Sequence, residues 1–155
     1  MLTLNDSSLL EPRAFINGKW VENGNTFPVL NPATGEKITD VTDVSVEETN
    51  SAIDQAYAAQ KDWADWTGKE RGAVLRKWYD LMLENADDLA AILTAEMGKP
   101  LAEAKGEVIY GASFVEWFSE EAKRIYGDVI PGHQRDKRIV AVSYTHLTLP
   151  TIYSV

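Results

Sequence analysis

The chain has 155 residues and a formal net charge of −9, from 24 acidic and 15 basic side chains. Its 45% hydrophobic and 25% charged residues are ordinary for a globular protein and exclude disorder by composition. The acidic balance excludes a nucleic-acid partner, and apolar runs of only a few residues exclude a membrane span. Cysteine is absent, so these residues hold no disulfide and no cysteine nucleophile. With no secretory signal at its N-terminus, the chain is expected to be cytoplasmic.

Residues 14 to 41 predict short strands joined by tight turns. Asn17-Gly18 is a dipeptide that accepts positive φ in a hairpin turn, and Asn23-Gly24 marks a second turn. Residues 27 to 30 form another apolar run, which the Thr34-Gly35 turn separates from a final strand over residues 37 to 41. The segment is therefore expected to be a small β meander.

From Ser45 onward the pattern becomes helical. Ser45 with Glu48, and Thr67 with Glu70, have the spacing of a capping box, so a helix is expected to begin at each. Apolar residues then recur every three or four positions. Asn85 is expected to interrupt the second of these helices, and Gly98 to end the third.

A long helix is predicted from Pro100 to Arg124, with Gly127 beyond its end. Each interior glycine of this helix, Gly106 and Gly111, costs about 1 kcal/mol relative to alanine. We therefore expect another element to approach closely at these two positions, with helix–helix packing inside one core favoured over a ligand groove. The five tryptophans occur at helical spacing and are expected to be core anchors.

Motifs that carry chemistry are mostly missing. The glycines form neither G-x-G-x-x-G nor G-x-x-x-x-G-K-[ST], so no phosphate-binding loop is visible. His133 and His146 lack the spacing of a metal site. Glu103 and Glu107 share one face of the long helix, where a buried pair could do acid–base work. A solvated face is the better interpretation, because other charges surround them.

Several segments in order resemble the N-terminal portion of an aldehyde dehydrogenase. They are residues 15–20 (FINGKW), 31–36 (NPATGE), Trp63 with Arg71 and Leu75-Arg76, 96–104 (EMGKPLAEA), and Glu107-Val108. Residues 114–128 (FVEWFSEEAKRIYGD), 130–134 and 136–138 resemble the succinate-semialdehyde dehydrogenase branch of that family.

The resemblance implies an α+β fragment of an α/β enzyme, in which a β meander precedes helices that flank a Rossmann-like sheet. It also implies an enzyme that oxidises succinate semialdehyde to succinate with NAD or NADP, and that forms a homodimer or homotetramer. The family's nucleophilic cysteine, general-base glutamate and glycine-rich turn are not in these residues. We therefore expect the fragment itself to be inactive and to bind no cofactor.

The resemblance also divides the chain. Residues 1–13 are an N-terminal extension, and 14–142 are the N-terminal part of the nucleotide-binding domain. Residues 130–142 begin a bridging strand of the oligomerisation sheet. Residues 143–155 fit nothing in the family and are interpreted as a non-native tail, similar to a translated sequencing adapter.

The resemblance implies two sites in this chain, a substrate entrance and a structural cation site. It places no catalytic residue and no cofactor-binding residue here. Gly106, Tyr110 and Phe114 are expected near the substrate entrance, with ordinary packing as the alternative for Tyr110. A structural cation is expected near Val29, Leu30 and Glu96, although Glu96 could instead be a helix-end carboxylate bonded to backbone.

Two other classes of function remain open from the sequence. The helices between Ser45 and Gly127 could form a self-sufficient bundle that binds a partner protein. Alternatively, Glu103 and Glu107 could serve an acid–base enzyme, which requires a closed pocket around the pair.

Overall fold

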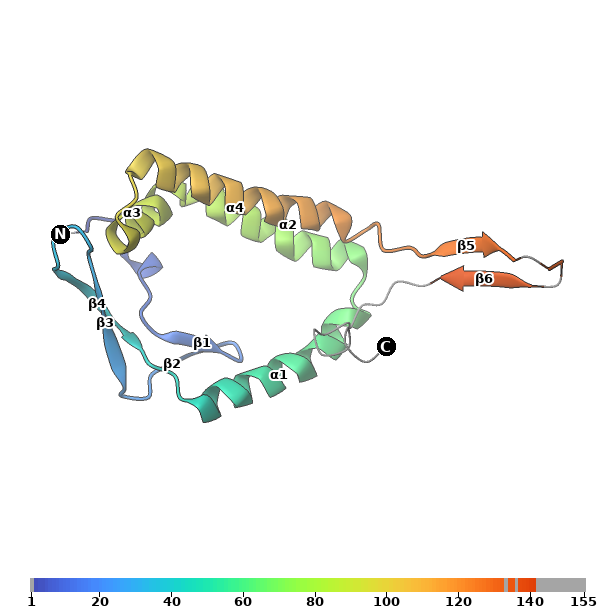
Figure 1. Cartoon of the computed structure of the whole chain (residues 1–155), viewed down its shortest axis with the longest axis horizontal. Helices are drawn as coiled ribbons and strands as arrows, with labels where there is room; N and C mark the ends of the chain where they lie inside the picture. The colour runs from blue at the N-terminus through green and yellow to red at the C-terminus, as the bar shows by residue number, and fades with distance from the viewer. Residues whose placement is uncertain (1, 133, 136, 142–155) are drawn as a thin grey trace.

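A computed structural model describes residues 2–132, 134, 135 and 137–141 of the chain. The fold is α+β, with short strand pairs before and after four α-helices (Figure 1). The expected tail, residues 143–155, lies outside the described residues.

The first strands form two separate hairpins rather than one continuous sheet. Strand β1 (Ala14–Ile16) pairs with β2 (Lys19–Val21) across Asn17-Gly18, where φ is 49° and 72°. This confirms the turn predicted from the dipeptide. Strand β3 (Thr26–Leu30) pairs antiparallel with β4 (Lys37–Thr42), with a register irregularity between Val29 and Leu30.

Helix α1 (Val46–Asp65) stands apart from the other helices (Figure 1). Ser45 and Glu48 form the predicted capping box, with N···O distances of 3.1 and 2.9 Å. None of the twenty residues of α1 is buried. The apolar stripe predicted along this helix is therefore left largely uncovered by the described residues.

Helices α2 (Gly68–Glu84), α3 (Ala86–Met97) and α4 (Leu101–Glu121) pack together, with α2 and α3 both against α4. The predicted capping box at Thr67 and Glu70 is present, and Asn85 separates α2 from α3. Gly98 ends α3 in the left-handed conformation, as predicted. Helix α4 is shorter than the 100–124 range expected, because Pro100 caps it and the α-helix ends at Glu121.

Close approach of two helices occurs at glycines other than those predicted. A Cβ at Gly106 or Gly111 would meet nothing within 4 Å, so the expectation of close contact there is wrong. The contacts are on α2, where a Cβ at Gly68 would lie 2.3 Å from the Ala122 carbonyl oxygen and one at Gly72 2.6 Å from that of Ser119. On α4 the small residues Ala104, Ala112 and Ser119 are buried.

The described residues between 128 and 141 form a hairpin, and the assignment of residues 130–142 to a bridging strand of an oligomerisation sheet stays a prediction. Strand β5 (Asp128–Pro131) pairs antiparallel with β6 (Arg138–Ala141) and projects away from the helices (Figure 1). Val129 and Val140 pair opposite one another in this hairpin and are 70% and 64% exposed.

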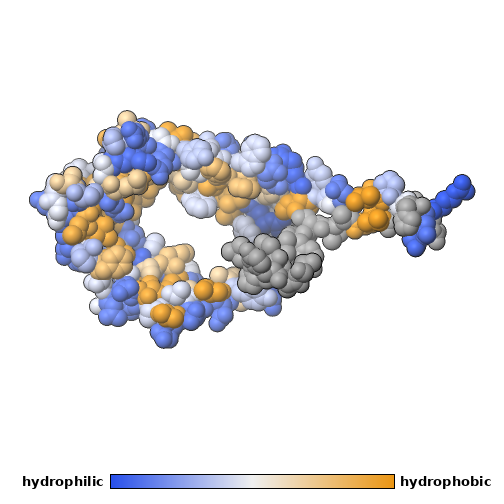
Figure 2. All heavy atoms as spheres, in the orientation of Figure 1, coloured by the Kyte–Doolittle hydropathy of each residue, from blue (hydrophilic) through white to orange (hydrophobic). Residues whose placement is uncertain are grey.

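The tryptophans are not core anchors. All five are exposed, from 38% for Trp63 to 60% for Trp117, and the buried apolar residues in the described part of the chain are four alanines. Figure 2 shows apolar surface bordering an opening between α1 and the α2–α4 bundle. The prediction failed because helical spacing identifies a face meant for burial, but not whether another element covers it.

No helix in the described ranges has both the length and the apolar character that a membrane span requires.

Candidate functional site

Helix α4 carries the residues expected at a substrate entrance. Gly106, Tyr110 and Phe114 follow one another at intervals of four and so share one face. The rings of Tyr110 and Phe114 meet edge to face, with centroids 5.0 Å apart and planes at 87°. Both side chains are exposed, so ordinary core packing does not explain Tyr110 within the described part of the chain. Whether they border a tunnel stays a prediction.

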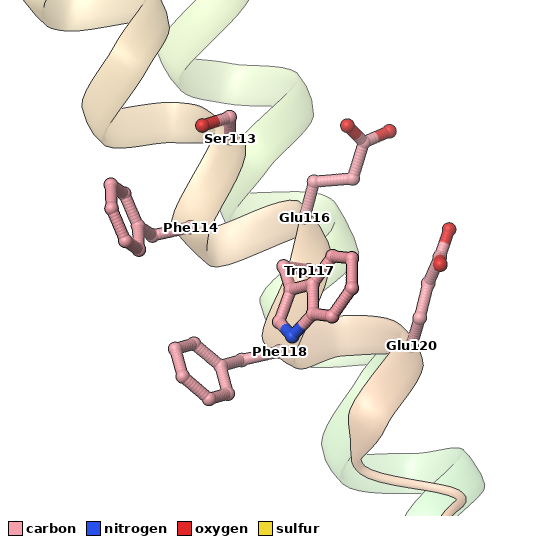
Figure 3. Close-up of a pocket in the computed structure, with 6 residues that line it drawn as sticks. All are labelled: Ser113, Phe114, Glu116, Trp117, Phe118 and Glu120. Atoms are coloured by element: carbon pink, nitrogen blue, oxygen red, sulfur yellow. The ribbon is translucent and has the colours of Figure 1, made fainter.

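A depression of about 460 Å³ begins at Phe114 and continues toward the end of α4 (Figure 3). Every side chain that lines it comes from α4: Ser113, Phe114, Glu116, Trp117, Phe118 and Glu120. Because one helix supplies the whole lining, the depression is an open surface rather than an enclosed site. Its aromatic floor and carboxylate rim can contact a molecule, but they include no nucleophile of the cysteine or lysine type.

An arginine network fixes the rim of this depression. Arg76 on α2 contacts Glu116 with an N···O distance of 3.2 Å and Asp80 with one of 3.1 Å. Its guanidinium also lies 4.8 Å from the centroid of the Tyr79 ring, a cation–π geometry. These contacts orient Glu116 beside the aromatic residues of α4.

Arg71 joins α1 to the bundle. Its Nη1 atom donates to the carbonyl oxygens of Trp63, Ala64 and Trp66, at 3.3, 3.1 and 2.7 Å. These carbonyls belong to the end of α1, where backbone acceptors lack helical partners. Next to this contact lies a smaller depression of about 290 Å³, which Phe118 of α4 also lines.

The expected cation residues lie on two elements that approach each other. Val29 and Leu30 end β3, and Pro32 just beyond them lies 3.1 Å from where a Gly98 Cβ would be, at the end of α3. Glu96, in the last turn of α3, is exposed and has no hydrogen bond to backbone among the described residues. The plain alternative for Glu96 is therefore not supported, although no group of three acidic or histidine side chains suited to a metal occurs in the described ranges.

The acid–base hypothesis for Glu103 and Glu107 requires that the pair be enclosed, and the described residues leave both side chains in solvent. Both side chains are exposed, and Glu107 pairs with Lys99. This agrees with the predicted solvated face.

The carboxylate that is buried in the described part of the chain was not predicted from the sequence as a binding group. Asp88 at the start of α3 is only 6% exposed and accepts hydrogen bonds from residues near the N-terminus. Backbone hydrogen bonds from Asn5 and Asp6 lower the pKa of this carboxyl below its ordinary value. An aspartate in the first turn of a helix is common, so no sequence signal pointed to partners more than eighty residues away.

Comparison with known proteins defines the class. Residues 20–145 match the model of the aldehyde dehydrogenase family, and the chain belongs to this family. A glutarate-semialdehyde dehydrogenase of Pseudomonas putida is 55% identical over 143 residues, 91% of this chain and 30% of the relative. The NADP(+) succinate-semialdehyde dehydrogenase of Escherichia coli is 53% identical, with the same coverage.

Solved structures of aldehyde dehydrogenases also superpose on this chain. An aldehyde dehydrogenase from Brucella melitensis biovar abortus superposes with a TM-score of 0.88 at 51% identity, over 92% of this chain and 30% of the other. A succinate-semialdehyde dehydrogenase from Burkholderia pseudomallei gives 0.85 at 51% identity, over 89% and 29%. The chain thus spans about 30% of the length of the curated relatives it matches.

Proposed function

We propose that this chain forms the N-terminal part of an NAD(P)-dependent aldehyde dehydrogenase that oxidises succinate semialdehyde to succinate. In that reaction the aldehyde carbon gives a hydride to the nicotinamide, and water supplies the second carboxylate oxygen. The supporting observation is identity of 53–55% to semialdehyde dehydrogenases over 91% of this chain. The competing hypothesis of a free-standing helical module has no such support, and it requires a packed bundle, whereas no residue of α1 is buried.

The names of the relatives define a substrate class. They act on succinate semialdehyde, glutarate semialdehyde and 3-sulfolactaldehyde. Each of these is a short aldehyde with an anionic group, carboxylate or sulfonate, at the opposite end. We extend this class to the complete enzyme, with NAD or NADP as hydride acceptor, a cytoplasmic location and assembly as a homo-oligomer.

The described residues do not fit a dinucleotide site by themselves, because they include no glycine-rich phosphate-binding turn. They also hold no cysteine to attack the aldehyde. The role proposed for them is to build the scaffold and the substrate approach. In this proposal Gly106, Tyr110 and Phe114 border the entrance. The carbonyl oxygens of Val29 and Leu30, with the Glu96 carboxylate, offer the hard oxygen ligands that a structural cation prefers.

The test uses a complete protein that contains this chain, with reduction of NAD or NADP followed by absorbance. Turnover is expected with succinate or glutarate semialdehyde and much less with butanal, which has no second anionic group. The 155-residue chain alone is expected to show no turnover, because it lacks the nucleophile. Equal rates with butanal would contradict the substrate class, and activity of the purified chain alone would contradict the assignment of roles.

The entrance residues are tested in the same complete enzyme. Tyr110→Ala should raise KM severalfold with little change in kcat, because the ring is proposed to guide substrate and not to react. Tyr126→Ala is the matched control, since Tyr126 is also exposed but lies beyond the end of α4. Equal effects of the two substitutions would exclude an entrance role for Tyr110.

A further inference from the structure

The hydrogen bonds that join the N-terminal segment to the other described elements all end on one side chain, while its leucines are half-buried. Asp88 Oδ1 accepts from the backbone N and the Nδ2 atom of Asn5, both at 3.0 Å, and Oδ2 accepts from the backbone N of Asp6 at 2.8 Å. We call residues 2–10 the strap. Within the described ranges, every hydrogen bond that joins the strap to another element ends on Asp88.

The strap has internal structure of its own. Asp6 caps the 3₁₀ turn Ser7–Leu9, with Oδ1 accepting from the backbone N and the hydroxyl of Ser8 at 2.9 and 2.6 Å. A segment that is ordered internally, and hydrogen-bonded to other elements at a single carboxylate, keeps only its apolar contacts when that carboxylate is lost, and it can then move as one body.

The strap borders a cavity of about 780 Å³, partly open to solvent, between itself, the β3–β4 hairpin and α3. Leu2, Thr3 and Leu10 of the strap line one side, and Thr94 of α3 lines another. The Thr94 hydroxyl oxygen is buried and has no hydrogen-bond partner within the described residues. An unpaired buried hydroxyl costs free energy unless an incoming group can bond to it.

We propose that Asp88 is a latch and the strap a gate over this cavity. With the Asp88 carboxylate engaged, the strap is closed over α3. Without it, the strap lifts as a unit and exposes Thr94. The Asp6 carboxylate is the charged group that faces the latch, and it opposes closure by repulsion; Asp87, next in sequence, is engaged with Lys105 at 2.6 Å instead.

Because the chain contains no cysteine, a single introduced cysteine reports on the gate. Thr94→Cys places a thiol in the cavity wall, and its rate of alkylation by iodoacetamide measures how often the cavity opens. The reporter is combined with Asp88→Asn, which keeps the shape of the side chain and removes its charge. Asp87→Asn is the matched control, since it removes the neighbouring carboxylate without touching the strap.

Alkylation in the Asp88→Asn background should be about tenfold faster or more, because even one hydrogen bond to a charged group accounts for about a factor of ten. The Asp87→Asn background should label as slowly as Thr94→Cys alone, and far more slowly than the same chain unfolded in urea. Equal rates in the two backgrounds would overturn the gate. So would labelling of Thr94→Cys alone at the unfolded rate.

Hydrogen exchange provides a second measurement that needs no cysteine. The backbone amides of Asn5 and Asp6 should exchange about tenfold faster in Asp88→Asn than in Asp87→Asn, while those of α2 and α4 keep their protection. Unchanged exchange at Asn5 and Asp6 would overturn the latch. Loss of protection throughout all helices would show that Asp88 supports the whole fold, which also overturns it.

Discussion

Replacing Gly72 with alanine tests the contact that holds α2 against α4. The new Cβ would lie 2.6 Å from the Ser119 carbonyl oxygen, 0.8 Å short of the 3.4 Å at which ordinary van der Waals contact begins. The obstacle is backbone, so it cannot rotate away, and the two helices must separate. Overpacking of this kind costs about 1–3 kcal/mol, while alanine returns about 1 kcal/mol of helix propensity.

Gly111→Ala provides the matched control, because a Cβ there meets nothing within 4 Å and the position is also inside a helix. Both substitutions gain the same propensity, so the difference between them isolates the strain. Gly111→Ala should stabilise the chain by about 0.5–1 kcal/mol. Gly72→Ala should therefore be about 1–3 kcal/mol less stable than Gly111→Ala.

The measurement is urea unfolding followed by helical circular dichroism. For a chain of this length, 1 kcal/mol corresponds to about 2–4 °C in a thermal melt, so the expected difference is readily resolved. If the two variants unfold at the same urea concentration, a Cβ at Gly72 does not strain the contact between α2 and α4. The close approach of these helices at Gly72 is then not important for stability.

Two further outcomes are expected. Arg13 holds the pKa of Glu11 at about 2 through a side-chain hydrogen bond, so the stabilisation from this pair is present above pH 4.5 and is lost as the pH falls toward about 2. Carbon NMR titration of Glu11 checks this: Arg13→Met should return the midpoint toward 4.5, and an unchanged midpoint would refute the pairing. The isolated chain should also associate and bind an apolar dye, because its tryptophans are exposed. Each Å² of apolar surface left in water forgoes about 25 cal/mol of stabilisation. Light scattering that shows a monodisperse monomer without dye binding would contradict this expectation.

Local features of the fold could be predicted from the sequence, because they depend on residues close together in the chain. The two capping boxes need only positions three residues apart, and the Asn17-Gly18 turn needs only two adjacent residues that accept positive φ. The left-handed Gly98 at the end of α3 is of the same kind.

Features that depend on distant partners could not be predicted. A glycine in a helix indicates a close approach only if another helix arrives there, and the sequence did not distinguish Gly72 from Gly111. In the sequence, Asp88 cannot be told from any other aspartate in the first turn of a helix, because its partners lie 82 and 83 residues away. The site on α4 was reached through family resemblance, since Tyr110 and Phe114 have no local pattern that separates an exposed aromatic face from a buried one.

The isolation of α1 has a consequence for the order in which the chain folds. Helices α2, α3 and α4 are consecutive, and α2 and α3 both pack against α4, so this bundle can form once the chain has been made as far as Glu121. Helix α1 gains no buried residue from the described elements, and most of the stability of a helix in a protein comes from packing of its apolar face. During synthesis of the proposed enzyme, the α2–α4 bundle would therefore be the first stable unit. Helix α1 would remain in rapid helix–coil exchange, tethered through Arg71, until later residues left the ribosome and covered it.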